Sequence, residues 1–194
     1  MLSTHDLPKV ILASASSRRH ELLSQLISHF DIQTADIDET PYQGELPEAL
    51  VQRLADSKAE AIWSQNPNAI VIGADTIVTL GDEIFGKPTS QNDSMNILKK
   101  LSEQRHIVMT GVAIFSATKK ISTVVKTEVE FTSLSSKQIH AYWQTGEPQD
   151  KAGSYAIQGI GGKFVKRING SYSNVVGLPL VETTSMLAEM GIHE

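Results

Sequence analysis

The chain of 194 residues contains no cysteine, which excludes disulfide bonds and metal sites built on thiolates. Its six histidines do not occur in a His-x-x-x-His or comparable spacing, so a zinc site is not expected. No apolar run approaches the ~20 residues that a membrane-spanning helix needs. The first ten residues, MLSTHDLPKV, lack a long apolar core, so no signal peptide is expected. These absences lead us to expect a soluble, cytoplasmic protein.

Positive charge is scarce relative to negative charge. The sequence holds 17 lysines and arginines against 22 aspartates and glutamates, a net charge of −5. Proteins that bind nucleic acids usually need a basic face, so this class of partner is not expected. Hydrophobic residues make up 40% and charged residues 20%, which is typical of a globular protein with a real core. Because no repeat or linker is visible, we expect a single domain over residues 1–194, whose two lobes no linker separates.

Helical and extended patterns alternate along the chain. Strands are predicted at residues 9–13, 30–37 and 69–80, and as a hairpin of residues 106–117 and 120–131. Helices are predicted at residues 17–29, 48–65, 91–101, 136–145 and 181–190. The remaining parts are a loop closed by Pro41 and Pro47 and a glycine-rich stretch at residues 153–170. This order indicates an α/β fold with a mixed sheet.

The stretch LASASSRRHELL, residues 12–23, places Arg18 and Arg19 in the first turn of a predicted helix. Cationic side chains are unfavourable at this positive end of the helix dipole unless an anion binds there. The hydroxyls of Ser14 and Ser16, the free helix amides and the two guanidinium groups together suit a phosphate. The stretch is not a P-loop, because it lacks that motif's glycines and its Lys-Ser/Thr ending. The alternative is a capped surface helix whose arginines are only solvated.

A single carboxylate, Asp75, interrupts the apolar stretch IVIGADTIV. Burying a charge there costs several kcal/mol unless it is paired or bound to a metal. Gly73 on the same face leaves room for something to approach. We expect Asp75 and Thr76 at the end of a central strand, where an open α/β sheet places its chemistry. The alternative is a structural aspartate that caps a helix or pairs with an arginine.

Further charges occur in separate segments. Lys58 lies in the second predicted helix, Lys87 lies in the GKP turn, and Asp38 and Glu39 lie in the loop before the second helix. Each has a simple alternative as a solvated surface charge. They contribute to a site only if the fold brings them to the buried carboxylate and the arginine pair.

The glycine-rich block carries Gln158 between apolar and glycine residues. Its amide offers both a donor and an acceptor, which is what reading the edge of a base requires. The glycines around it indicate tight turns or close approach of the backbone. The alternative is a structural amide that braces the loop.

Seven segments occur in a fixed order along the chain: LASASSRRHELL, DETP, RLADSKA, GADTIV, GKP, DKAGSYAIQG and NVVGLPL. Together they resemble the Maf family of nucleoside triphosphate pyrophosphatases, and the resemblance runs from about residue 11 to residue 188. It implies a Maf/inosine triphosphate pyrophosphatase-like fold, which is an α/β, mixed, twisted sheet with flanking helices and two lobes around a deep cleft. It also implies hydrolysis of a nucleoside triphosphate to the monophosphate and pyrophosphate, as house-cleaning of the nucleotide pool. A link to cell division arrest stays open.

Two motifs make the chain resemble one branch of that family. The branch acting on dTTP and UTP shows Ala-Asp-Thr after the central strand and Ile-Gln-Gly later, as residues 74–76 and 157–159 do here. The 7-methyl-GTP branch instead shows Ser-Asp-Gln and Ser-Glu-Gly. One departure is Ser17, where many members have proline, and this affects loop stiffness more than chemistry. The resemblance therefore implies dTTP and UTP, or modified pyrimidine nucleotides, as substrates.

The resemblance also implies roles for individual positions. Asp75 is similar to the acceptor that activates water. The acidic positions near a divalent metal cation, Mg²⁺ or Mn²⁺, are Asp75 and Glu39. The positions tied to base specificity are Arg18, Thr76 and Gln158. The positions that line the triphosphate site are Ser14, Arg19, Lys58 and Lys87.

Partners and alternative functions stay open from the sequence. A homodimer is a common state of such α/β enzymes and is one expectation, whereas neither nucleic acid nor membrane is expected as a partner. The family name refers to septum formation, so a regulatory or nucleic-acid-binding module without significant catalysis is one alternative. The net charge of −5 argues against it. An inosine-triphosphate-type enzyme of similar architecture and purine preference is another.

Overall fold

The computed structural model describes residues 8–193, so residues 1–7, where no signal peptide was expected, lie outside it. The strands are β1 Val10–Ala13, β2 Asp31–Ile32, β3 Ile70–Leu80, β4 Glu83–Phe85, β5 Arg105–Phe115, β6 Lys120–Phe131 and β7 Val165–Asn169. The α-helices are α1 Ser17–Leu23, α2 Pro47–Trp63, α3 Gln91–Leu101, α4 Ser136–Trp143, α5 Tyr172–Val176 and α6 Leu180–Glu189. Short 3₁₀ helices between α4 and β7 are η1 Glu147–Asp150, η2 Ala152–Ser154 and η3 Ile160–Phe164.

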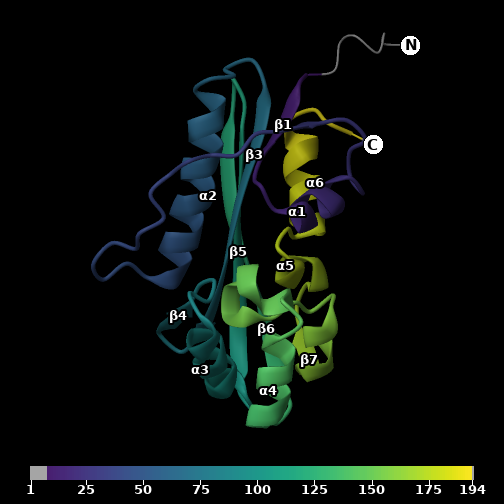
Figure 1. Cartoon of the computed structure of the whole chain (residues 1–194). Helices are drawn as coiled ribbons and strands as arrows, with labels where there is room; N and C mark the ends of the chain where they lie inside the picture. Colours follow the sequence, from purple (N-terminus) through teal and green to yellow (C-terminus); the bar gives the residue numbers. More distant parts are fainter. Residues whose placement is uncertain (1–7, 194) are drawn as a thin grey trace.

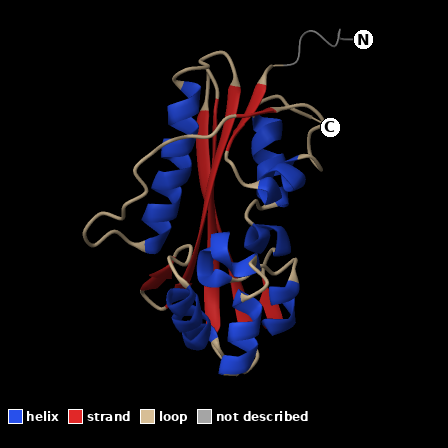
Figure 2. Cartoon of the chain, in the orientation of Figure 1, coloured by secondary structure: helices blue, strands red, loops and turns tan. Residues whose placement is uncertain are grey.

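The strands form one mixed sheet. Its order is β2-β1-β3-β5-β6-β7, with β4 paired to β3. β1 runs parallel to β2 and β3, whereas the other pairs are antiparallel. The long strands β3, β5 and β6 run through both halves of the molecule (Figures 1 and 2). The predicted α/β fold with a mixed sheet and flanking helices is confirmed.

Three apolar clusters fix the helices to the sheet. In the upper half of Figure 1, α2 packs on one face of the sheet through Ala55, Ala59 and Ile62. On the opposite face, α1 and α6 pack through side chains such as Leu23 and Leu187. The lower half has its own core, in which α3 and α4 cover the far ends of the long strands. Two lobes therefore share one sheet.

One edge of β3 carries two different partners. Along this edge, β1 pairs with residues 70–73 and β4 with residues 78–80, while β5 covers the other edge. Within the described chain, residues 74–77 therefore have no strand partner on the first edge. The sheet is open at this point, beside the carboxyl end of β1, where open α/β sheets bind ligands. The prediction that Asp75 lies at the end of a strand is wrong. Asp75 lies in the middle of β3, because β3 continues into the lower half.

Two glycines let α2 lie very close to the sheet. A Cβ atom at Gly73 on β3 would lie 2.6 Å from the amide nitrogen of Ala59. A Cβ atom at Gly111 on β5 would lie 2.5 Å from the carbonyl oxygen of Val51. Only glycine fits at such a close approach of two backbones. The space beside Gly73, which the sequence analysis left for an approaching group, is thus filled by helix α2.

We expect Gly111→Ala to lower the free energy of unfolding by about 1–3 kcal/mol, the usual cost of overpacking a core. The added methyl group meets a backbone carbonyl of α2, which cannot rotate away as a side chain would. Urea unfolding followed by circular dichroism measures this change. Gly86→Ala is the matched control, because a Cβ atom there has nothing within 4 Å. Equal stability of the two variants would show that α2 does not press on the sheet at Gly111.

The first helix is shorter than predicted. α1 ends at Leu23 instead of near residue 29, although Leu26 and Ile27 still pack against the upper core. The Ser24 hydroxyl donates a hydrogen bond to a backbone carbonyl one turn earlier, and such local bonds compete with the helix. The helical spacing of the apolar residues thus continues beyond Leu23, but the chain there forms turns instead of helix.

Three other segments also differ from the prediction. Only residues 31–32 of the predicted strand at residues 30–37 pair with β1. Pro47 opens α2 rather than closing the loop before it, since the first helical position needs no amide hydrogen. The glycine-rich stretch contains β7, and α5 follows it. Both elements are short, and contacts with the hairpin strands β5 and β6 hold them in place.

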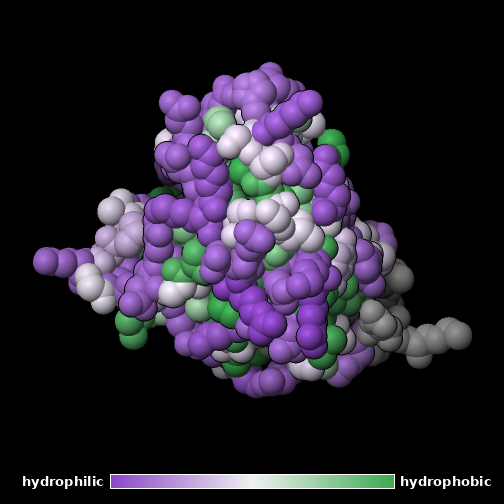
Figure 3. Space-filling model, turned by 90° about the horizontal axis from the view of Figure 1, so that it is seen from below, coloured by the Kyte–Doolittle hydropathy of each residue, from purple (hydrophilic) through white to green (hydrophobic). Residues whose placement is uncertain are grey.

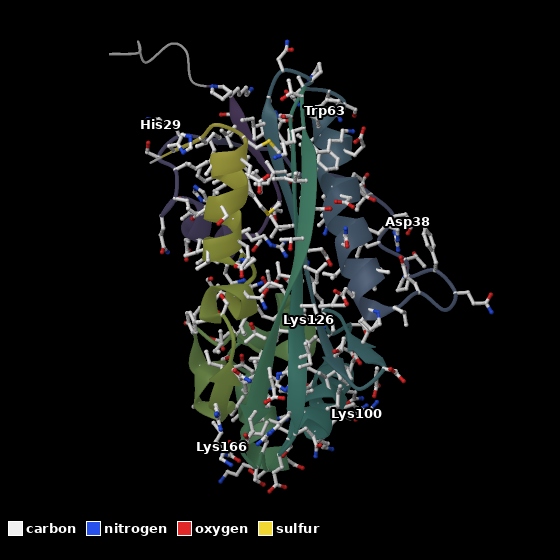
Figure 4. The ribbon with its side chains drawn as sticks, turned by 180° about the vertical axis from the view of Figure 1, so that it is seen from behind. His29, Asp38, Trp63, Lys100, Lys126 and Lys166 are labelled. Carbon is white, nitrogen blue, oxygen red and sulfur yellow. The ribbon has the colours of Figure 1, made fainter. Side chains whose placement is uncertain are left out.

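The face at the lower end of the molecule is mainly polar. Seen from the lower end, hydrophilic residues cover most of the face, and apolar residues appear in small groups between them (Figure 3). On the opposite side from Figure 1, labelled lysines lie along β6 and near the lower end (Figure 4). These lysines form ion pairs with acids, namely Lys126–Glu48, Lys166–Glu130 and Lys100–Glu83. No helix of residues 8–193 combines the length and the apolar character needed to cross a membrane.

Candidate active site

A cavity of about 910 Å³ opens beside the free edge of β3. Its walls come from both lobes, namely from the β1–α1 loop, α2, β3, the turn after β4 and the segment around η1 and η2. The structure places every predicted site residue in its lining: Ser14, Arg18, Arg19, Glu39, Lys58, Asp75, Thr76, Lys87 and Gln158. The fold thus brings together groups that the sequence distributes over six segments.

Asp75 is buried and paired. Its residue surface is 8% exposed, and its Oδ1 accepts a hydrogen bond from Lys58 Nζ on α2 at 2.7 Å. The same ammonium group lies 2.7 Å from Glu39 Oε1. Burial raises the pKa of Glu39, but the hydrogen bond and charge of Lys58 outweigh this effect and hold the pKa below its usual value. Lys58 therefore bridges the two carboxylates predicted near the metal, and an arginine partner for Asp75 is not what the structure shows.

Three neutral acceptors hold the guanidinium group of Arg19. Its Nε donates to the carbonyl oxygen of Gly177 at 2.8 Å, its Nη1 to Ser14 Oγ at 3.3 Å and its Nη2 to Thr76 Oγ1 at 2.9 Å. Burial lowers the pKa of Arg19, and the charge of Asp75 partly offsets this effect. A guanidinium group has five N–H donors, so two remain for a ligand. Because none of the three acceptors is charged, the positive charge of Arg19 stays available to an anion.

A chain of hydrogen bonds continues from Thr76 into the core. Thr110 donates its hydroxyl hydrogen to the carbonyl oxygen of Asn174 at 3.0 Å, so it must accept in its 2.9 Å contact with Thr76. Thr76 therefore donates to Thr110 and accepts from Arg19. The buried amide of Asn174 in turn donates to the hydroxyl of Thr127 at 3.0 Å. This network holds the Arg19 side chain in place. Asn174 lies in the segment NVVGLPL, but no role was assigned to it or to Thr110 from the sequence.

Arg18, Lys87 and Gln158 face the cavity without fixed partners. Among the described residues, neither cation forms a salt bridge and the Gln158 amide forms no hydrogen bond. Burial lowers the pKa of Arg18, and the charge of Asp150 partly offsets this effect. The structure therefore does not support the alternative in which Gln158 braces its own loop. All three side chains are free to meet a ligand.

The cavity also has lining residues to which no role was assigned from the sequence, namely Glu147, Asp150, Lys151 and Tyr155. The last three lie in the segment DKAGSYAIQG that resembles the Maf family, whereas Glu147 precedes it. Asp150 and Lys151 form an ion pair with each other, so they add little net charge. Since Lys58 is also paired with acids, the uncompensated positive charge of the cavity lies on the arginine pair and the GKP lysine.

The carboxylates of Glu39 and Asp75 suit a hard divalent cation. Both lie 2.7 Å from one ammonium group, so they are close enough to share a positive partner. Residues 8–193 contain no group of three or more histidines, aspartates or glutamates placed to hold a metal ion. A donor set of one or two carboxylates fits Mg²⁺ or Mn²⁺, which complete their coordination with water and substrate phosphates. It does not provide the nitrogen and sulfur ligands of a zinc site.

The loop that carries Glu39 is fixed outside the cavity. Arg53 Nε on α2 lies 2.6 Å from Glu45 Oε1, and its guanidinium carbon lies 3.9 Å from the centre of the Tyr42 ring. Asp38 accepts a hydrogen bond from the backbone amide of Thr40 at 2.9 Å and lies on the outer loop beside α2 (Figure 4). Asp38 is therefore a turn residue, whereas its neighbour reaches the site.

Comparison with known proteins gives a consistent result. The family described as Maf-like protein matches residues 9–190. A dTTP/UTP pyrophosphatase from Pseudoalteromonas atlantica is 53% identical over 190 residues, which cover 95% of this chain and 99% of that protein. A dTTP/UTP pyrophosphatase from Myxococcus xanthus is 50% identical over 183 residues, 94% of this chain and 93% of that protein. A solved HAM1 protein from Coxiella burnetii aligns with a TM-score of 0.50 and 15% identity over 94% of this chain and 100% of that chain, which shows a shared fold.

Proposed function

The chain belongs to the Maf family, and from this premise we propose that it is a nucleoside triphosphate pyrophosphatase that acts on dTTP and UTP. One observation carries the proposal for this chain: a buried carboxylate, Asp75, lies in the same cavity as three cations, Arg18, Arg19 and Lys87, that form no salt bridge among the described residues. Such a cavity suits a polyanionic substrate that is attacked by water, with the carboxylate accepting the proton of that water. The alternative of a regulatory module without catalysis is not favoured, because the relatives of about half identity carry a hydrolase name.

The cations of the cavity offset the negative charge of the proposed substrate. A nucleoside triphosphate brings about four negative charges at neutral pH, and these must be offset before a nucleophile approaches. We assign the phosphates to Arg18, Arg19 and Lys87, with the Ser14 hydroxyl beside them. Arg19 is already oriented by its three acceptors, so little ordering is needed when the substrate binds. Arg18 and Lys87 supply further charge from opposite lobes.

Asp75 accepts the proton in the proposed reaction. Water attacks the α-phosphorus, the bond from that phosphorus to the bridging oxygen breaks, and pyrophosphate leaves with the bond's electron pair. The proton of the attacking water passes to the Asp75 carboxylate, and the cations stabilise the charge that develops on the leaving pyrophosphate. Before substrate and cation bind, Lys58 holds the carboxylate in place through its 2.7 Å hydrogen bond. We assign the proton of the attacking water to Asp75 Oδ2, the carboxylate oxygen that does not accept the hydrogen bond from Lys58.

Glu39 and Asp75 are the residues that we propose to hold a divalent cation. When bound, Mg²⁺ or Mn²⁺ would supply positive charge to the phosphate oxygens. Lys58 already occupies the space between the two carboxylates in this structure. We therefore expect the Lys58 ammonium to move toward the phosphates, in keeping with its predicted role there.

Base selection is proposed for Arg18, Thr76 and Gln158. Gln158 can offer one donor and one acceptor to a pyrimidine edge, and its amide is free. The hydroxyl of Thr76 is committed to Arg19 and Thr110, so we assign its influence to the position that it gives Arg19. We also propose that residues 1–194 act as one domain, in the cytoplasm and without a nucleic-acid partner. We further propose a homodimer, which sedimentation analysis can test.

Pyrophosphate release from a panel of nucleotides tests the proposal. We expect dTTP and UTP to be hydrolysed at least about tenfold faster than CTP, ATP, GTP and ITP at equal low concentrations. We expect EDTA to abolish the reaction, since the substrate charge is then not offset. Release of orthophosphate in place of pyrophosphate, or a preference for ITP, would contradict the assignment.

A further inference from the structure

The loop that carries Gln158 is attached to the protein by one carboxylate. Glu147, the first residue of η1, lies with Oε1 2.8 Å from the backbone amide nitrogen of Ile160 and with Oε2 2.9 Å from that of Gly161. Both amides donate, so each carboxylate oxygen accepts one backbone hydrogen bond, and the two donors are consecutive residues. The first of them, Ile160, follows Gln158 by two positions. The attachment therefore lies next to the side chain proposed to read the base.

A tyrosine completes the attachment on the other side of Gln158. The hydroxyl of Tyr142 on α4 donates to Glu147 Oε2 and accepts from the backbone amide of Ala156 at 3.0 Å. Tyr142 is fully buried, so its hydroxyl is fixed by packing as well as by these bonds. Burial, followed by the hydrogen bond to Glu147, raises the pKa of Tyr142, which keeps the hydroxyl a donor. Glu147 and Tyr142 thus hold Ala156 and Gly161, and Gln158 lies between the two fixed points.

The glycines of the loop fit this attachment closely. A Cβ atom at Gly159 would overlap a carboxylate oxygen of Glu147, and one at Gly161 would lie 2.5 Å from the Tyr142 hydroxyl. Larger residues at these positions would push the loop off the carboxylate. The glycine-rich composition of residues 153–170 is therefore explained at these two positions by close approach to one Glu–Tyr pair.

The position of Glu147 is unexpected for a cavity that receives an anion. Its carboxylate lines the same cavity as the arginine pair, where a free negative charge would repel phosphates. Burial raises the pKa of Glu147, but the hydrogen bonds from Tyr142 and from the two backbone amides outweigh this effect and lower the pKa. The carboxylate is thus ionised and fully engaged by donors. Its hydrogen bonds commit both oxygens to the loop instead of to a ligand.

From these contacts we propose that Glu147 and Tyr142 are positioning residues. They set the base preference of the enzyme by fixing the loop that carries Gln158, so that its side chain stays in one position in the cavity. The proposal rests on the proposed function, because it takes Gln158 as the group that reads the base. Glu147 itself touches no substrate atom in this proposal. Weakening the hydrogen bonds between Glu147 and the loop should let Gln158 move. The hydrogen bonds from Gln158 to uracil and thymine then weaken, whereas the phosphate site stays intact.

Steady-state kinetics with UTP and CTP test the proposal. Glu147→Gln keeps the size of the side chain but replaces one acceptor oxygen by a donor, so one backbone amide loses its partner. We expect kcat/KM for UTP to fall about tenfold, mostly through KM, and kcat/KM for CTP to change little, so that the UTP-to-CTP ratio narrows. Glu189→Gln on the surface of α6 is the matched control and should leave both values unchanged. Equal losses for the two nucleotides would overturn the proposal.

A double-mutant comparison separates positioning from a general structural effect. If Glu147 acts through Gln158, adding Glu147→Gln to Gln158→Ala should cause no further narrowing of the UTP-to-CTP ratio. Tyr142→Phe, which removes the hydroxyl but keeps the ring, should narrow the ratio in the same direction. Additive changes in the double variant would overturn the proposal.

Hydrogen exchange gives a readout that does not depend on hydrolysis. We expect the amides of Ile160 and Gly161 to exchange faster in Glu147→Gln than in the wild type and in the Glu189→Gln control. Unchanged exchange would overturn the attachment itself, whatever the kinetics show. A wild-type protein that releases no pyrophosphate from UTP would contradict the proposed function, and the exchange rates would still decide whether Glu147 holds the loop.

Discussion

Asp75→Asn is expected to lower kcat for UTP and dTTP by about 10²–10⁴-fold, the usual contribution of a positioned general base. The amide keeps the size of the carboxylate but cannot accept a proton from water at neutral pH. Nucleotide binding should persist, because the arginine pair and Lys87 lie in other segments. Turnover is measured by pyrophosphate release, and binding by calorimetry with UTP and Mg²⁺.

The matched control is Asp38→Asn. Asp38 lies in the same sequence region as Glu39, but it accepts a hydrogen bond in an exposed turn outside the cavity. We expect its kcat to equal that of the wild type. Full activity of Asp75→Asn, or an equal loss in both variants, would remove Asp75 from the role of proton acceptor.

Lys58→Met should have the largest effect on stability. Removing one partner of a buried ion pair leaves an uncompensated charge and typically costs about 3–5 kcal/mol. The side chains of Lys58 and Asp75 are only 12% and 11% exposed, so water cannot replace the lost ammonium group fully. We expect the free energy of unfolding at pH 7, measured in urea, to fall by about that amount.

A second variant keeps this prediction testable. In Lys58→Met/Asp75→Asn the unpaired charge is gone, so the double variant should recover part of the stability lost by Lys58→Met alone. Lys100→Met is the surface control, because Lys100 pairs with Glu83 while about half of each side chain is exposed, and such pairs contribute about 0–1 kcal/mol. A double variant less stable than Lys58→Met would contradict a buried pair between Lys58 and Asp75.

Much of the fold followed from patterns that are local in sequence. α3 spans Gln91–Leu101 as predicted, because Ser90 caps its first turn through a side-chain hydrogen bond and its apolar residues have helical spacing. The hairpin of β5 and β6 followed from two long β-branched runs with a polar turn. β7 and α5 escaped prediction because they are short and are held by contacts with β5 and β6 rather than by their own composition.

The sequence predicted which residues make up the candidate site but not how they are arranged in space. The residue patterns gave the nine candidate positions, the resemblance to the Maf family gave their expected roles, and all nine line one cavity. Nothing in the sequence shows that the glycines under α2 bring Lys58 to Asp75, because that contact depends on how closely a helix lies on a sheet. The contacts of Thr110, Asn174 and Glu147 were not predicted for a related reason, since each involves backbone groups of segments distant in sequence.

The central claim is that this cavity holds a pyrimidine nucleoside triphosphate with its α-phosphate at Asp75. A crystal structure of the Asp75→Asn variant with Mg²⁺ and UTP tests it most directly, because the substrate should remain uncleaved. We predict the α-phosphate beside Asn at position 75, the β- and γ-phosphates against Arg18, Arg19 and Lys87, and the uracil edge at Gln158. A nucleotide bound with its phosphates at Gln158 and away from Asp75, or bound outside this cavity, would contradict the account.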